Sequence, residues 1–477
     1  RGATTEHTLL NAGFNLLGTS LAAQEYWDNH RALDYLLTRK DIDPEHIGVY
    51  GSSGGGTQTA YYIGLDPRVK VAAICSFFST RERTMELQGP SDGCQHIPYE
   101  GREQLEVPDF ALMMAPRPLL ILSGKYDFVD LWGAQQGYAE LQQCYKVLGV
   151  PEKVDMLTVE TGHGLGVEKR QKLVSWFKRW LKDDQSPVKK AAQDRFQLSD
   201  MLCTTRGQVN VSMPGALSIM QENVNQLDEW ASKREAFLSK GKKTVQAKML
   251  DLLGLKGLPD HKIRIEATGH DSMREYEQYK FQLIREGEMP VPCILIIPSR
   301  ANADSPVELR LQEEGKGTYL SEYANFAAAL TEGKILLLAD LRGLGETTDP
   351  AFYTDAKYWN REYRNAMISM HIGRPIMGQR VVDILTLLDF CSEHEFLKGH
   401  SVKVFANGIY GPAAIHAAYL DERINSVEIT HSVKTWKEYI ERPMQWDMYS
   451  NVLYGALKYY DLPDLIRLSN RSIRFAD

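Results

Sequence analysis

The sequence predicts an α/β protein built from two similar units, and three observations lead to this prediction. Short runs rich in aliphatic residues alternate with amphipathic helical stretches over residues 1–182, which is the pattern of a mostly parallel sheet covered by helices. The same alternation returns from about residue 263. A shift of 355 positions aligns the second region with the first without a gap. We therefore expect two copies of one α/β fold.

The elements of the first unit follow from their hydrophobic periodicity. Strands are expected at 46–50, 69–76, 118–123 and 153–158, and helices at 21–37, 54–64, 132–148 and 167–181. A polar stretch at 183–190 then precedes a charged helical pattern at 221–253. Strands resume at 281–284, 293–297, 307–311, 334–339 and 402–405. These changes predict an α/β unit at 1–184, a linker with bridging helices at 185–255 and a second unit at 256–477.

The internal repeat depends on identical residues at one constant shift, the signal that repeated architectures leave in a sequence. Chance matches between two βαβ segments are the alternative interpretation. The matched positions are Gly18 with Gly373, Gln24 with Gln379, Asp28 with Asp383, Leu33-Asp34 with Leu388-Asp389, Val49 with Val404 and Leu65-Asp66 with Leu420-Asp421.

The two copies are expected to be incomplete at opposite ends. Arg1-Gly2 resembles Arg342-Gly343, which follows the fourth strand of the second copy, so the first copy lacks its early strands. A counterpart of residues 115–119 occurs at 469–473, so the second copy stops before its last strands. An unpaired central strand would expose backbone hydrogen-bonding groups. We therefore expect these 477 residues to belong to a longer polypeptide, unless the missing half is replaced in another way.

Composition and charge exclude several classes of protein. Apolar residues make up 43% of the chain and charged residues 25%, which excludes a disordered protein. The formal charge is −7 and no dense block of Lys and Arg occurs, so nucleic acid is not an expected partner. No apolar run approaches the ~20 residues that a membrane-spanning helix needs. The 6 cysteines have no CxxC spacing, which argues against a zinc site or a disulfide framework.

The strongest local motif is GSSGGG at residues 51–56, which contains G-x-S-x-G between a predicted strand and a predicted helix. This context is typical of a nucleophile elbow, whose sharp turn requires neighbours without bulk. Ser53 is then the candidate nucleophile, and the peptide N–H of Gly54 is the candidate oxyanion donor. A glycine-rich turn with a capping serine is the alternative. A phosphate-binding loop is not expected, because no Gly-Lys-Ser/Thr follows.

A serine nucleophile needs an acid and a histidine, which follow such an elbow in the order Ser, acid, His. Asp127 comes just after the strand 118–123, where open α/β sheets place functional groups. Asp130 is the competing carboxylate three residues further on. His163 lies between two glycines in the loop after the strand 153–158. This order and placement predict Ser53, Asp127 and His163 as a catalytic triad.

Several motifs together resemble a known superfamily. They are RALDYL (31–36), IGVYGSSGG (47–55), MAPRP (114–118) and TGHG (161–164). The chain resembles the α/β-hydrolase superfamily and, within it, the bacterial acetylxylan-esterase-like and prolyl-oligopeptidase-related carbohydrate esterases, including forms with two tandem hydrolase domains. LCTTRGQV (202–209) is similar to the connector of the tandem enzymes, and ADLRGLG (339–345) to their fourth-strand turn.

The resemblance implies the same three catalytic residues and a serine carboxylic-ester hydrolase that uses no metal and no cofactor. It also implies a periplasmic or secreted enzyme, although residues 1–30 contain no signal-peptide pattern and the chain does not begin with methionine. The repeat places Gly408 at the position of Ser53. Because glycine carries no nucleophile, the second unit is expected to be inert as a hydrolase and to serve as structural support, to complete the pocket or to contact glycans.

The resemblance implies a polysaccharide ester as substrate, most directly acetylated xylan. Tyr126, Trp132 and Tyr99 offer aromatic faces that suit sugar rings, and His96 lies on a loop that can line the pocket. Burial in the core is the ordinary alternative for such aromatic residues. The other functions left open are a methylesterase on uronic acid esters, a peptidase of the prolyl-oligopeptidase type and a non-catalytic pseudo-hydrolase that binds glycans. The sequence does not indicate an oligomeric state.

Overall fold

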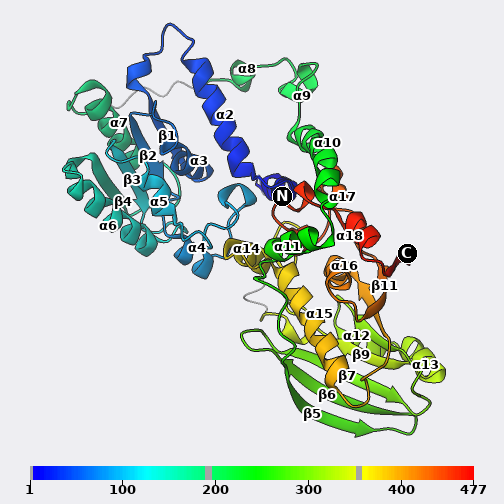
Figure 1. Ribbon diagram of the computed structural model, residues 1–477. Helices are drawn as coiled ribbons and strands as arrows, with labels where there is room; N and C mark the ends of the chain where they lie inside the picture. The colour runs from blue at the N-terminus through cyan, green and yellow to red at the C-terminus, as the bar shows by residue number, and fades with distance from the viewer. Residues whose placement is uncertain (1–3, 189–195, 351–356, 477) are drawn as a thin grey trace. The chain divides into compact units, whose positions relative to one another are not determined.

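The computed structural model describes residues 4–188, 196–350 and 357–476. The chain separates into two compact units, of which the first comprises 1–11 and 20–221 and the second comprises 12–19 and 222–477. Each unit contains a β-sheet packed with helices (Figure 1), so the predicted α/β class is confirmed. The domain boundaries expected at residues 184 and 255 remain a prediction. Arg1 and Gly2, which resemble Arg342-Gly343, lie outside the described residues.

The first unit is organised around a four-stranded sheet with the order β1-β2-β3-β4. All three strand pairs are parallel, so the carboxyl ends of the strands lie along one edge. The strands are β1 (Gly48–Ser52), β2 (Val71–Cys75), β3 (Leu119–Gly124) and β4 (Val154–Val159). Each lies within two residues of the boundaries that the sequence predicted.

Helices cover both faces of this sheet. The helices between residues 4 and 182 are α1 (Thr5–Leu16), α2 (Leu21–Leu36), α3 (Gly54–Ile63), α4 (Arg81–Leu87), α5 (Val107–Leu112), α6 (Leu131–Val147) and α7 (Val167–Lys182), with the 3-10 turns η1 (Pro44–His46), η2 (Gly93–Gln95) and η3 (Pro151–Lys153). The last residues of α1, from 12 onward, belong to the second unit. Apolar residues of α2, α3, α5 and α6 pack on one face of the sheet. Leu173 and Trp176 of α7 pack on the other. Strands β2 and β3 are therefore buried on both faces, as is usual in parallel sheets.

The charged segment that follows contains four helices. They are α8 (Leu198–Met201), α9 (Val209–Ser212), α10 (Ile219–Leu238) and α11 (Lys242–Leu252). The continuous pattern predicted at 221–253 is thus divided in two. The division falls at Gly241, whose φ of +92° is a conformation that glycine adopts readily and that no helix contains.

The second unit has an eight-stranded mixed sheet with the order β12-β11-β10-β8-β9-β7-β6-β5. Strands β8 to β12 pair in parallel, whereas β5, β6, β7 and β9 pair in an antiparallel manner with their neighbours on that side. The strands are β5 (Arg264–Ser272), β6 (Tyr276–Ile284), β7 (Val291–Pro298), β8 (Val307–Leu311), β9 (Ile335–Ala339), β10 (Val402–Asn407), β11 (Ile424–Thr430) and β12 (Ser472–Phe475).

The helices of the second unit differ in how deeply they are buried. They are α12 (Lys316–Ser321), α13 (Tyr323–Glu332), α14 (Tyr363–His371), α15 (Ile376–Glu393), α16 (Gly411–Leu420), α17 (Lys437–Glu441) and α18 (Leu462–Leu468), with the 3-10 turns η4 (Gly345–Thr347), η5 (Gly408–Tyr410), η6 (Met448–Asn451) and η7 (Ala456–Lys458). All ten residues of α16 are buried.

Elements of the two units correspond at the shift of 355 residues seen in the sequence. The starting residues of α2 and α15 differ by this shift, as do those of α5 and α18. The starting residues of the other corresponding pairs differ from it by at most three, and these pairs are α1 with α14, β1 with β10, α3 with α16, β2 with β11, α4 with α17 and β3 with β12. An ion-pair network also recurs. Arg68 contacts Asp66 at 2.6 Å and Asp34 at 2.5 Å, and at the shifted positions Arg423 contacts Asp421 at 2.6 Å and Asp389 at 2.7 Å.

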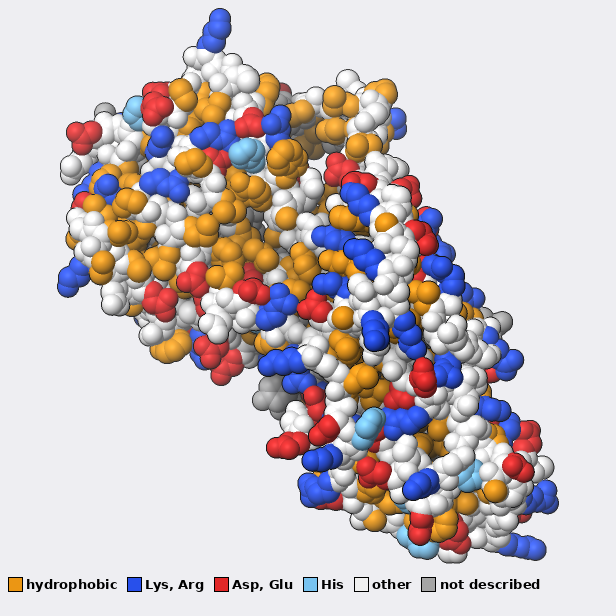
Figure 2. All heavy atoms as spheres, in the orientation of Figure 1, with side chains coloured by type: hydrophobic (Ala, Val, Ile, Leu, Met, Phe, Trp, Pro, Cys, Tyr) orange, Lys and Arg blue, Asp and Glu red, His pale blue; other side chains and the backbone are white. Residues whose placement is uncertain are grey.

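The surfaces of the two units differ on the face drawn in Figure 2. Hydrophobic side chains occupy much of the visible face of the first unit, and charged side chains of both signs occupy that of the second. None of the helices in the described ranges is long and apolar enough to cross a membrane.

Candidate active site

Ser53 occupies a strained turn between β1 and α3. Its φ of 59° and ψ of −121° lie outside the regions that residues with a side chain ordinarily adopt. The turn is held to the neighbouring strand, because the peptide N–H of Ser53 donates to the carbonyl of Cys75 at 3.0 Å. This is the backbone geometry that a nucleophile elbow requires.

The glycines of the motif have different roles in this turn. A Cβ at Gly51 would collide with the carbonyl group of Gly55, and one at Gly56 would lie 2.7 Å from the carbonyl oxygen of Cys75. At Gly54 and Gly55 a Cβ would meet no atom within 4 Å. The expectation that both glycines of G-x-S-x-G are required for space is therefore right for Gly51 and wrong for Gly55.

Asp127 and His163 lie within hydrogen-bonding distance of each other. Asp127 follows β3 and His163 follows β4, and Nδ1 of the imidazole lies 2.7 Å from Oδ1 of the carboxylate. The two loops are also joined through their backbones, because Tyr126 N–H donates to the carbonyl of Thr161 at 3.1 Å. The structure thus brings two of the three predicted catalytic residues into contact.

The third residue, Ser53, lies at the same edge of the sheet without a direct hydrogen bond to His163 within the described part of the chain. A chain of contacts connects them. Ser53 N–H donates to Cys75, and the hydroxyl of the next residue, Ser76, accepts the peptide N–H of Gly164 at 3.0 Å. Catalytic hydrogen bonds are often formed only when substrate is present.

The environment of Asp127 favours the ionised carboxylate. Its side chain is only 1% exposed, and this burial raises the pKa. Hydrogen bonds from His163 and from the peptide N–H of Val129, together with the nearby hydroxyl of Ser76, lower the pKa by more, so that it falls below its usual value. A carboxylate that stays ionised can hold His163 in one orientation and stabilise the imidazolium form.

The competing carboxylate, Asp130, has a different role. It is the N-cap of α6, where its side chain accepts the peptide N–H of Gly133 at 2.7 Å. The same carboxylate pairs with Arg83 at 3.3 Å. Asp130 is therefore engaged in the helix terminus, and Asp127 is the acid that contacts the histidine.

Two further residues support the histidine loop, and sequence reasoning missed both. Ser76 follows β2 with a positive φ of 50°, and Lys169 of α7 is completely buried. The ammonium of Lys169 donates to the Ser76 hydroxyl at 3.2 Å and to the carbonyl of Gly164 at 3.0 Å. The second contact holds Gly164, the residue next to His163, directly, and the first holds it through Ser76, whose hydroxyl accepts the peptide N–H of Gly164. Ser76 could have been found from its position at the carboxyl end of a strand. Lys169 could not, because a lysine within a charged helix carries no signal of a functional role.

The aromatic residues predicted near the site differ in exposure. Tyr126 is 66% exposed and Trp132 is 54% exposed. The guanidinium of Arg83 lies over the Trp132 ring at 5.1 Å. His96, by contrast, is buried at 4% exposure. Phe128, which the sequence did not single out, stacks on the His163 imidazole with ring centroids 4.2 Å apart.

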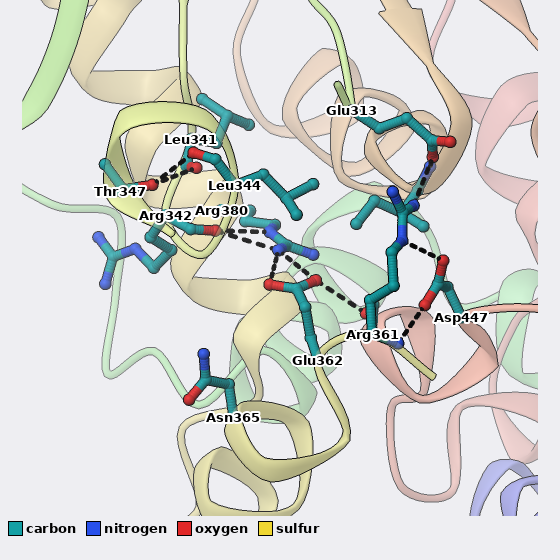
Figure 3. Close-up of polar contacts among 12 residues, drawn as sticks. Glu313, Leu341, Arg342, Leu344, Thr347, Arg361, Glu362, Asn365, Arg380 and Asp447 are labelled. Carbon is teal, nitrogen blue, oxygen red and sulfur yellow. Dashed lines mark hydrogen bonds and ion pairs between the residues drawn. The ribbon is translucent and has the colours of Figure 1, made fainter. Parts of the chain in front are cut away.

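The position of Ser53 in the second unit is occupied by Gly408, at the end of β10. Its φ of 60° matches that of Ser53. The carboxylate of Glu313 lies directly over it, and its Oε2 accepts the peptide N–H of Ile409 at 3.0 Å. Arg361 contacts both Glu313 and Asp447, which holds this carboxylate in place (Figure 3).

Comparison with known proteins finds a family match in the first unit. Residues 16–184 match the prolyl oligopeptidase family. The matched segment contains Ser53, Asp127 and His163, and the match confirms the resemblance to the α/β-hydrolase superfamily. A Bacillus subtilis (strain 168) protein named as a hydrolase, YtaP, is 26% identical over 168 residues, which are 35% of this chain and 56% of that relative. The matched region thus spans little more than half the length of this curated relative.

The solved structures that partly match this chain include two acetyl xylan esterases by name. One, from Bacteroides fragilis NCTC 9343, is 12% identical with a TM-score of 0.44, over 55% of this chain and 75% of that chain. The other, from Thermoanaerobacterium sp. JW/SL YS485, is 14% identical with a TM-score of 0.33, over 49% of this chain and 77% of that chain.

Proposed function

We propose that the chain is a serine carboxylic-ester hydrolase that acts on carbohydrate esters and removes acetyl groups from a plant polysaccharide such as xylan. The observation that carries the proposal is the 2.7 Å contact between His163 and the buried Asp127 at the sheet edge where the Ser53 elbow lies. A strained serine, an oriented imidazole and an ionised acid are the parts that acyl transfer requires.

In the proposed reaction His163 takes the proton of the Ser53 hydroxyl as the oxygen attacks the ester carbonyl. Negative charge develops on the carbonyl oxygen, and the peptide N–H of Gly54 stabilises it at the start of α3. His163 then donates its proton to the sugar oxygen, which leaves as an alcohol. Water activated by the same imidazole hydrolyses the acyl-enzyme, and acetate is released. Asp127 remains ionised throughout.

The carbohydrate part of the proposal has two supports. The motifs at 31–36, 47–55, 114–118 and 161–164 resemble those of carbohydrate esterases. In addition, the exposed rings of Tyr126 and Phe128 lie on either side of Asp127 in the chain, and the exposed ring of Trp132 lies at the start of α6. Aromatic faces exposed beside a catalytic histidine can stack on the apolar C–H surfaces of a sugar.

Product analysis tests the proposal. The protein is incubated with acetylated xylan and, in parallel, with methyl-esterified pectin, and acetate and methanol are measured. We expect acetate from the first substrate and none from a Ser53→Ala variant. Methanol from pectin instead would reassign the enzyme as a methylesterase, and cleavage of prolyl peptides would reassign it as a peptidase. If a fluorophosphonate probe failed to label Ser53, the remaining interpretation would be a non-catalytic pseudo-hydrolase that binds glycans.

A further inference from the structure

Three side chains with metal-binding atoms converge in the first unit outside the candidate active site. His7 lies on α1, Glu25 on α2 and Cys94 in η2. The imidazole Nδ1 lies 3.1 Å from Sγ of Cys94 and 3.8 Å from Oε1 of Glu25. All three ligand atoms lie within 4.8 Å of one another. No spacing motif joins these residues, so a site here was not predicted from the sequence.

These distances suit one ion of the zinc class. With Zn–N and Zn–O bonds near 2.0–2.1 Å and Zn–S near 2.3 Å, the ligand atoms of a tetrahedral ion lie about 3.3 to 3.6 Å apart. The observed 3.1 and 3.8 Å bracket that range. Imidazole, thiolate and carboxylate together form a ligand set that borderline-soft ions such as Zn²⁺ prefer over Mg²⁺ or Ca²⁺.

The backbone around the three residues is positioned without any ion. The peptide N–H of Gly93 donates to the hydroxyl of Thr8 at 2.9 Å, which joins η2 to α1. The peptide N–H of Leu21 donates to the side chain of Asn11 at 2.8 Å, which joins α2 to α1. Ligands on elements that are already held together lose little freedom when an ion binds.

The second unit holds a positive charge at the corresponding place. The shift of 355 residues carries His7, Glu25 and Cys94 to Glu362, Arg380 and Tyr449. There the guanidinium of Arg380 contacts the Glu362 carboxylate at 2.5 and 2.6 Å (Figure 3), and both side chains are buried. The fold therefore accommodates a buried cation at this position when acidic groups face it.

We propose that His7, Glu25 and Cys94 bind one divalent ion of the zinc class and that this ion ties α1 to α2 and η2. Three protein ligands leave the fourth tetrahedral position to water. The ion has no part in the ester chemistry of Ser53, and its role is to stabilise the first unit. The proposal therefore stands or falls independently of the proposed function.

Binding of Co²⁺ and Zn²⁺ to the full chain, first stripped of metal with a chelator, tests this proposal. We expect one equivalent of Co²⁺ to bind, with a thiolate-to-cobalt charge-transfer band in the near ultraviolet and the visible bands of a tetrahedral ion. Zn²⁺ should abolish both and raise the thermal unfolding midpoint. Cys94→Ser should remove the charge-transfer band and weaken binding at least about a hundredfold.

Two variants guard against misfolding and accidental thiol binding. His7→Gln changes a side chain that is 36% exposed, and it should fold by circular dichroism while losing tight Co²⁺ binding. Cys203→Ser removes an exposed cysteine elsewhere and should bind like the parent. A parent protein without the charge-transfer band, or equal binding by the parent and Cys94→Ser, would show that His7 and Cys94 share only a hydrogen bond. Ser53→Ala should bind the ion as the parent does.

Discussion

The turns at Ser53 and Gly408 have nearly the same φ value but differ in the side chains at and around them. Their φ values are 59° and 60°, and each connects a parallel strand to a helical segment. In the first unit the space beside the next residue, Gly54, is open. In the second unit the peptide N–H of Ile409 is bound by the Glu313 carboxylate. The turn is thus retained in the second unit, while a carboxylate of the protein itself occupies the peptide N–H that follows it.

The difference extends to the charges around each turn. Glu313 is held by Arg361, which also pairs with Asp447 at 2.7 Å. In the first unit the corresponding edge carries His163 and Asp127, which belong to a hydrogen-bonded pair with a partly exposed imidazole. The second turn is closed by an ion-pair network, whereas the first presents groups that can exchange protons with a substrate.

The largest expected loss of activity comes from a substitution at Ser53, which tests whether only the first of the two turns is catalytic. Ser53→Ala removes the only nucleophile that this comparison assigns, and loss of a triad serine costs about 10⁶ in kcat. Ester hydrolysis and fluorophosphonate labelling should both disappear. Ser52→Ala, at the last residue of β1 and next to Ser53, is the matched control and should retain activity. Hydrolysis by Ser53→Ala at the parent rate would mean that the second unit or another serine is active.

Asp127→Asn should have the next largest effect. Loss of the carboxylate leaves His163 in the wrong tautomer, and in serine hydrolases this costs about 10⁴ in kcat. Asp130→Asn is the control and should affect the stability of α6 more than the rate, because Asp130 caps that helix. A larger rate loss in Asp130→Asn than in Asp127→Asn would reverse the assignment of the acid.

The same variant gives a pH prediction. The folded-state pKa of Asp127 lies below its ordinary value of 3.8. The stability that its ionised form contributes is therefore present above pH 3.8 and is lost as the pH falls through the folded pKa. In urea unfolding between pH 2 and pH 7, Asp127→Asn should be less stable than the parent at neutral pH and should approach it at the acid end. A constant difference across this range would argue against the pKa shift.

Lys169→Met sharpens the comparison at the histidine loop. Lys169 is a positioning residue, and small misplacements of a catalytic group can cost about 10² in rate. We expect kcat to fall by up to that factor, with a changed pH profile of kcat/KM because His163 is held less firmly. Lys172→Met is the control, since Lys172 lies on the same helix and only pairs with Asp155 near the surface. Equal pH profiles for the two variants would show that Lys169 does not position His163.

The smallest effect on activity is expected from Gly408→Ser. A serine there would collide with the Glu313 carboxylate, so ester hydrolysis should not return when the change is made in a Ser53→Ala background. The collision should destabilise the second unit by about 1–3 kcal/mol, measured by thermal unfolding. Adding Glu313→Ala should relieve this loss. Recovery of hydrolysis by Gly408→Ser alone would show that the second turn is a competent site.

Local sequence was sufficient to predict the four strands of the first sheet and the helices α2, α3, α6 and α7, and to select three catalytic candidates, whereas α1, α4 and α5 were not predicted. Each strand of that sheet is marked by a short aliphatic run, and Ser53, Asp127 and His163 each follow such a run. The contact between Asp127 and His163 follows from parallel strands that end at one edge. The second sheet was predicted less completely, because the exposed, polar residues of β5 show no clear alternation and the strand is recognised only through its pairing with β6.

By itself the sequence determined which backbone could make the elbow and which residue types could perform acyl transfer, because both depend on neighbours along the chain. Only the tertiary structure decided that Asp127 rather than Asp130 contacts the histidine, that Lys169 supports its loop and that Glu313 closes the second turn. It also decided that His7, Glu25 and Cys94 meet. The physical reason is that these contacts join segments separated by tens of residues, and their geometry is set by how helices and loops pack on the sheet.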